Sequence, residues 1–150
     1  QKRDSDDSNG ETNYMFIRYA DVLLMYAEAC NELGETREAL DKLEMVRARA
    51  RRTVHPADMT VGLPEITETG KEKLREIIWN ERRIELALEG HRFFDLIRAD
   101  KVVPGYAEKM MKAHGKTNFS IAKHATFFIP QKQVDISQGV LKISSPGPFS

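Results

Sequence analysis

Two glutamates, Glu81 and Glu85, stand four residues apart in the segment IIWNERRIELALEGHRFFDLIR, and His91 follows them. Residues four apart share one face of a helix, so this group could act as a general acid and base or bind a metal ion. Metal cages inside helical bundles place a histidine three residues after a glutamate. None of the chain's histidines has a glutamate at that distance: His55, His91, His114 and His124. The spacing therefore gives little support to a metal site.

The residues around these glutamates favour a structural role instead. On a helix, both carboxylates fall in the middle of an apolar face formed by Leu74, Ile77, Ile78 and Leu88. Buried carboxylates need hydrogen-bonded cations, and arginine matches a carboxylate with two parallel N–H groups. Arg18 or Arg47, from earlier in the chain, can reach this face. We predict a structural ion network made of Glu81, Glu85, Arg82, Arg92 and Arg98. We predict no catalytic residue, metal ligand or cofactor.

Other chemically distinctive residues also favour structural roles. Trp79 could stack on a sugar or a peptide, but a position between helices is favoured. Cys30 is expected to behave as a small apolar residue. The sequence has no G-x-G-x-x-G, G-x-x-x-x-G-K-[ST], H-E-x-x-H or G-x-S-x-G motif, and nothing else in it points to an enzyme. A basic cluster consists of Arg47, Arg49, Arg51 and Arg52. It could contact phosphate, but we interpret it as the solvated last turn of a helix.

The composition limits the classes to which the chain can belong. Of its 150 residues 41% are hydrophobic and 31% charged, and the mean hydropathy is −0.50. These values are typical of a single globular domain and exclude collagen-like, disordered and membrane-spanning classes. Twenty-three basic and 23 acidic residues give a net charge of zero, so nucleic acid is not an expected partner. One cysteine excludes an internal disulfide and a cysteine-based zinc site.

The first elements that position these residues are two helices, over 15–33 and from Thr36 to about residue 52. Gly34 ends the first helix, and so short a connection predicts an antiparallel hairpin within 14–52. Apolar residues cover more than half of the first helix, so neighbours must cover it on two sides. With few hairpins to stack on it, we expect this helix to expose an apolar strip or to cover it by self-association.

A second hairpin is expected over 69–101. Thr69 and Glu72 match a capping box that opens a helix, and a shorter helix follows Gly90. Residues 1–13 should form a disordered tail or linker, and 102–150 an irregular tail. The predicted fold is all-α: tetratricopeptide-like antiparallel helical hairpins with an irregular C-terminal tail and little or no sheet.

Three blocks of the sequence resemble a known family. They are FIRYADVLLMYAEACNELGETREALDKLEMVRARAR, LREIIWNERRIELALEGHRFFDLIR and FFIPQKQVDIS, in that order. Together they are similar to the C-terminal portion of the SusD/RagB family of Bacteroidetes outer-membrane lipoproteins, over roughly residues 14–149. Relatives tend to close with N-P-G-Y or N-P-G-W, where this chain has SPGPF at 145–149. The most specific positions of the resemblance are Glu81, Arg82, Arg83, Glu85, Leu86, Glu89, Gly90, Arg92, Asp95 and Leu96.

The resemblance implies a binding protein and not a hydrolase. Such proteins capture an oligosaccharide or polysaccharide, or peptides in some branches, at the cell surface as partners of a TonB-dependent (SusC-like) transporter. Family members are longer, so the remainder of a parent chain is an expected partner, and it would carry the lipid anchor in the outer membrane. No ligand-binding residue is carried over, and the aromatic residues worth testing are Tyr106, Phe119 and Trp79.

Two other functions remain open from the residues alone. The helical hairpins are also compatible with a tetratricopeptide-type protein–protein interaction scaffold that binds a peptide in a concave groove. A helical metalloenzyme is the third class, and it would require a metal ion at Glu81 and Glu85.

Overall fold

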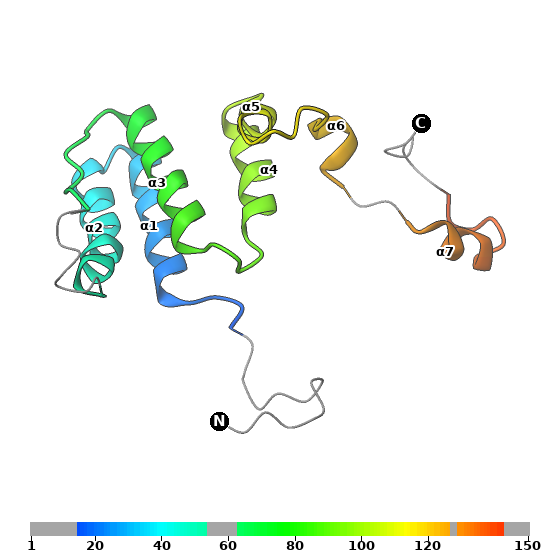
Figure 1. Ribbon diagram of the computed structural model, residues 1–150, viewed down its shortest axis with the longest axis horizontal. Coiled ribbons are helices and arrows are strands. Elements are labelled where there is room, and N and C mark those ends of the chain that lie inside the picture. The colour runs from blue at the N-terminus through cyan, green and yellow to red at the C-terminus, as the bar shows by residue number, and fades with distance from the viewer. Residues whose placement is uncertain (1–14, 54–62, 127–128, 143–150) are drawn as a thin grey trace, which may run out of the picture. The chain divides into compact units, whose positions relative to one another are not determined.

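The computed structural model describes residues 15–53, 63–126 and 129–142 (Figure 1). Every regular element in these ranges is a helix and none is a strand, so the all-α prediction is confirmed. The chain forms two compact units, Gln1–Leu88 and Glu89–Ser150. None of the described helices is both long enough and apolar enough to cross a membrane. The predicted tail at 1–13, residues 54–62 and the last part of the predicted C-terminal tail lie outside the described residues.

Helices α1 (Tyr19–Leu33) and α2 (Thr36–Thr53) form the predicted first hairpin. Gly34 has the left-handed conformation expected of it, with φ 85°, and its N–H donates to the Asn31 carbonyl at 3.1 Å. The Glu35 N–H donates to the Cys30 carbonyl at 2.8 Å, which completes a Schellman motif. The helix begins later than predicted, because Arg18 is extended and its carbonyl accepts the first helical hydrogen bonds.

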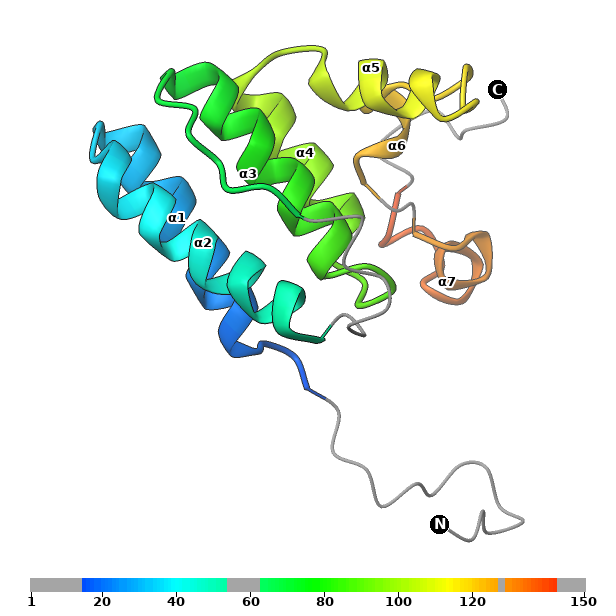
Figure 2. The same ribbon diagram turned by 60° about the vertical axis from the view of Figure 1, so that its left-hand side comes forward.

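The core of the first unit lies between three helices, because α1 packs on both α2 and α3 (Lys71–Glu85). Figure 2 shows α1 and α2 side by side. The prediction that the first helix is covered on two sides is therefore confirmed. The core consists of Leu23, Leu24, Ala27, Cys30, Ala39, Leu43, Val46, Leu74 and Ile78.

Both ends of α3 differ from the prediction. Gly70 takes the N-cap position with no side-chain cap, so the capping box of Thr69 and Glu72 is wrong. The Glu68 carboxylate accepts the Gly70 N–H instead, at 2.8 Å. At the other end the helix stops at Glu85, and Leu88 has a positive φ of 67° and a fully exposed side chain. Leu88 therefore does not belong to the apolar face of this helix.

The second unit contains α4 (Arg92–Val102), α5 (Tyr106–Ala113), α6 (Ile121–His124) and α7 (Gln131–Ile136). Its core consists of Leu96, Ala107 and Phe119, surrounded by partly buried apolar residues. Three short helices thus occupy a stretch that the sequence alone described as an irregular tail. Because α3 and α4 belong to different units, the second hairpin over 69–101 stays a prediction.

Candidate functional site

The polar contacts between α1 and α3 form a ladder along the two helices. Arg18 pairs with Glu85 at 2.6 Å, and Asp21 with Arg82 at 2.7 Å. Further along, Glu28 accepts a hydrogen bond from Trp79 Nε1 at 2.8 Å, and Glu32 accepts two from Arg75 at 2.5 and 2.7 Å. Residue numbers rise along one helix while they fall along the other, so the helices are antiparallel and the charges fix their register.

Glu81 forms a buried ion pair with α2. Its Oε2 lies 2.6 Å from Arg47 Nη1, and the two side chains are 8% and 9% exposed. The other terminal nitrogen of Arg47 donates to the Pro64 carbonyl at 2.8 Å, which ties the segment before α3 to α2. A buried charge is tolerated only when it is paired and hydrogen-bonded. This pair therefore joins two helices and the connection between them.

Glu85 is shared by two arginines. Arg18 donates from Nη1 to its carboxylate at 2.6 Å and from Nη2 to its backbone carbonyl at 2.5 Å, while Arg49 of α2 pairs with the same carboxylate. Glu85 thus joins the start of α1, the end of α2 and the end of α3. The two glutamates singled out in the sequence both lie where these three helices meet.

The predicted arginines lie in both units of the structure. Arg82 of α3 contacts Asp21 of α1, with both side chains 5% exposed. Arg98 lies in the second unit, where its Nη2 is 3.3 Å from Asp95 Oδ1. Arg92 is the first residue of α4, also in the second unit. That Arg92 and Arg98 belong to the network of Glu81 and Glu85 stays a prediction.

Asp21 is one residue of this network that sequence reasoning did not select. Together with Glu28 and Glu32 it forms the polar sector of an otherwise apolar helix, and such a sector is normally assigned to solvent. The signal that could have found it is the matching spacing of Arg75 and Arg82, seven residues apart on α3.

The arginines near the C-terminus of α2 form more ion pairs and hydrogen bonds than the arginines of a solvated last turn would. Arg47 and Arg49 pair with glutamates of α3. Arg51 pairs with Glu44 and donates to the Leu63 carbonyl at 3.2 Å. The solvated interpretation therefore fails for Arg47, which is buried, whereas Arg49 keeps half of its side chain exposed while it pairs with Glu85.

Hydrogen bonding alters the pKa values of one rung of the ladder. The hydrogen bonds from Arg75, reinforced by its positive charge, hold the pKa of Glu32 below its ordinary value. The same interaction raises the pKa of Arg75. Glu32 is therefore a negative charge at neutral pH and not a proton donor. Burial raises the pKa of the Cys30 thiol, so this cysteine is a poor nucleophile near neutral pH.

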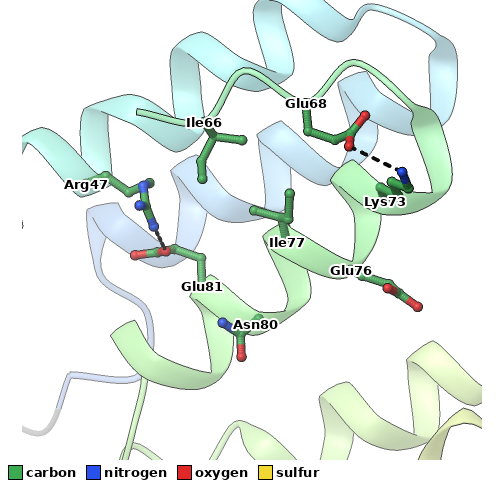
Figure 3. Close-up of a pocket in the computed structure, with 8 residues that line it drawn as sticks. All are labelled: Arg47, Ile66, Glu68, Lys73, Glu76, Ile77, Asn80 and Glu81. Carbon is green, nitrogen blue, oxygen red and sulfur yellow. Dashed lines mark hydrogen bonds and ion pairs between the residues drawn. The ribbon is translucent and has the colours of Figure 1, made fainter. Parts of the chain in front are cut away.

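A cavity of about 560 Å³ opens beside the buried ion pair, between the segment before α3 and α3 itself. In Figure 3, Ile66 and Ile77 point toward one another, and Arg47 and Glu81 meet at one end. Lys73 and Glu68 form a loose pair at the other end, at 3.9 Å. Glu76 and Asn80 complete the lining. The carboxylates of the cavity lining could accept hydrogen bonds from a polar ligand, and the Asn80 amide could donate one. The most buried charges of the lining, those of Arg47 and Glu81, already neutralise each other.

Within the described ranges, no three or more His, Cys, Asp or Glu side chains come together in a way that could hold a metal ion. Of the three aromatic residues proposed for testing, two are buried and the third packs against a core. Trp79 is 4% exposed and hydrogen-bonded to Glu28, as its predicted position between helices requires. Phe119 is 9% exposed and stacks on His124, and Tyr106 packs against the same core. A sugar ring cannot stack on Trp79 or Phe119 in this arrangement.

Known proteins are similar in sequence to this chain. The model of the SusD family matches residues 1–142. SusD-like protein P38 of Formosa agariphila is 39% identical over 94 residues, which are 62% of this chain and 18% of that protein. SusD-like protein P2 of the same organism is 42% identical over 91 residues, 58% of this chain and 17% of that protein. The match thus spans less than a fifth of each relative's length. No solved structure matches the chain. On the strength of the match to residues 1–142, the chain belongs to the SusD family.

Proposed function

We propose that this chain is part of a cell-surface binding protein that captures a glycan and presents it to a TonB-dependent outer-membrane transporter, without covalent chemistry. The observation that carries the proposal is the family match over residues 1–142, which agrees with the resemblance of the separate sequence blocks. The ligand would be an oligosaccharide or polysaccharide. The protein would be held at the outer membrane by a lipid anchor in a longer parent chain.

In this proposal the described helices support the binding protein and do not form its ligand site. Glu81 and Glu85 are neutralised by arginines of α1 and α2, and Trp79 is held by Glu28. Aromatic stacking and hydroxyl hydrogen bonds hold a sugar, and stacking requires an accessible ring face. The ion network would brace the fold, so the residues that choose the glycan would lie in other parts of the protein.

The test is binding of the parent protein, the polypeptide that contains this chain together with any further residues its gene encodes, to defined polysaccharides. Affinity electrophoresis with starch, xylan, mannan or pectin in the gel should retard the protein in at least one case. Co-purification with a TonB-dependent transporter from outer membranes should accompany it. Binding to none of these glycans but to unstructured peptides would favour the tetratricopeptide-type interaction scaffold and overturn the glycan assignment.

A further inference from the structure

The outer face of α1 carries no charge of the helix itself. The charged residues of α1 are Asp21, Glu28 and Glu32, and each of them contacts a side chain of α3. The exposed residues of α1 are all apolar or aromatic: Tyr19, Val22, Met25, Tyr26, Ala29 and Leu33. A helix at a protein surface normally turns its charged residues toward water. This side of α1 is therefore unlike a side that stays in water.

The outer sides of α2 and α3 have the normal arrangement. Most exposed residues of α2 are charged, and they include Arg37, Asp41, Arg49 and Arg52. Most exposed residues of α3 are charged as well, and they include Lys71, Glu72, Lys73 and Glu76. Among the three helices of the first unit, only α1 thus has an exposed side without charged residues. The feature belongs to one helix face and not to the surface of the unit in general.

The spacing of the exposed residues on α1 is that of a seam between two helices. They recur at intervals of three, four, three and four: Tyr19, Val22, Tyr26, Ala29 and Leu33. Alternating steps of three and four give the 3.5-residue repeat with which one helix packs along another. A row of this kind along a whole helix marks an interaction site, whereas scattered apolar residues are normal at a surface. The row therefore fits a partner helix about as long as α1.

The described part of the chain has no other helix that matches this row. α4 is shorter than α1, and its exposed residues include Arg98 and Lys101. α5, α6 and α7 have eight, four and six residues, against 15 in α1. The sequence of residues 1–13 contains no large apolar side chain. The matching helix therefore has to come from another stretch of polypeptide.

The parent polypeptide is the source that the length of the relatives indicates. The 94 matched residues are 18% of SusD-like protein P38, so that protein is roughly 520 residues long, far longer than this chain. Permanent interfaces resemble the core of a domain and contain few charges, and a contact within one polypeptide avoids the entropy lost when two molecules associate. We propose that a helix of the parent polypeptide, from outside these 150 residues, packs along the outer face of α1. This inference rests on the proposed function only in making the chain a portion of a longer protein.

Photo-crosslinking in the parent protein tests which segment covers the face. The photoreactive residue p-benzoylphenylalanine replaces Tyr19 in one variant and Tyr26 in another, and mass spectrometry identifies the crosslinked peptides. Both variants should crosslink within the same polypeptide, to one segment outside the 150 residues. Because Tyr19 and Tyr26 are two helical turns apart, the two attachment sites should lie about seven residues apart in that segment. The matched control places the same photoreactive residue at Asp41, on the charged side of α2, and should not reach that segment.

Cysteine labelling in the parent protein tests whether the face is closed to water. In a Cys30→Ser background, Ala29→Cys should react with a maleimide at least about tenfold more slowly than Asp41→Cys, because labelling has to wait for the covering helix to open. Both positions are exposed in the 150-residue chain, so the difference reports on the rest of the parent protein. Circular dichroism of each variant checks that the helices are intact. Equal labelling rates would show that the face stays in water.

Four further results would overturn the proposal. A crosslinked product of twice the parent's mass would assign the face to a second copy, and a product that contains the transporter would assign it to that partner. Attachment within residues 89–150 would assign it to the second unit. A gene that encodes no residues beyond this chain would leave no segment to cover the face. Polysaccharide binding is measured separately, so a failed glycan assignment and a failed crosslink can be told apart.

Discussion

Arg82 of α3 and Asp21 of α1 form a buried ion pair across the two helices, with 2.7 Å between Nη1 and Oδ1 and both side chains 5% exposed. Asp21 stands on the first helix of the unit and Arg82 on its third, 61 residues later. The pair therefore reports directly on the packing of α1 against α3.

Removing one partner of this pair should lower the free energy of unfolding far more than replacing both partners by apolar residues. Arg82→Met should lower the free energy of unfolding by about 3–5 kcal/mol, because it leaves a buried carboxylate without its cation. Adding Asp21→Leu replaces the pair by apolar side chains and should recover part of that loss. Urea unfolding followed by circular dichroism compares the variants. A double variant less stable than Arg82→Met alone would contradict a dominant role for the unpaired charge.

Glu81→Ala should be similarly damaging, by about 3–5 kcal/mol, because it leaves Arg47 charged and buried. The matched control is Lys112→Ala, which removes one partner of an exposed pair with Glu108 at 3.9 Å and should change stability by less than about 1 kcal/mol. The measurement is the urea midpoint of each variant. Equal midpoints for Glu81→Ala and wild type would show that this carboxylate is solvated.

Glu32 should make the free energy of unfolding depend on pH. Its pKa is lowered in the folded chain relative to the ordinary value of 4.5, so its stabilising contribution is complete above about pH 4.5. The contribution is lost as the pH falls through the lower, folded pKa, because the carboxylate is then protonated in both states. Glu32→Gln should be less stable than wild type at pH 6, and the difference should shrink toward pH 3. The control is Glu76→Gln, an exposed carboxylate of α3, for which a difference of the same size and pH dependence would contradict the assignment.

Cys30 should react slowly with a thiol reagent. Its side chain is 3% exposed, and burial, with help from Glu35 and Glu38, raises its pKa, so little thiolate forms at pH 8. In Ellman's assay the native chain should react much more slowly than the chain in 8 M urea. A Cys30→Ser, Ala29→Cys variant moves the thiol to the exposed face of the same helix and should react rapidly when native. Equal native rates would show that Cys30 is accessible.

Gly34→Ala should lower stability by about 1–2 kcal/mol. The cause is the backbone conformation, since φ is 85° and a Cβ at this position would meet no atom within 4 Å. Gly34→Asn should cost less, because asparagine tolerates the left-handed region. Thermal unfolding of the two variants provides the comparison, and equal costs would point to a cause other than backbone strain.

The sequence by itself determined the helical class, the end of α1 at Gly34 and the membership of the SusD family. Helix periodicity and the left-handed requirement of a helix end are local properties, so they can be read from neighbouring residues. The apolar residues around Glu81 also predicted a carboxylate away from water, and it is 6% exposed. The same local rules were insufficient at the two ends of α3, where the N-cap is Gly70 and not Thr69, and where the helix ends at Glu85, before Leu88.

Only the tertiary structure decided which charges meet. The sequence offered several arginines for two glutamates, and it could not show that Arg47 would reach Glu81 while Arg82 turned to Asp21. Those pairings depend on the antiparallel register of α1 against α3, and on the position of α2 beside both helices. That register follows from the packing of side chains 43 to 67 residues apart, which no local pattern records.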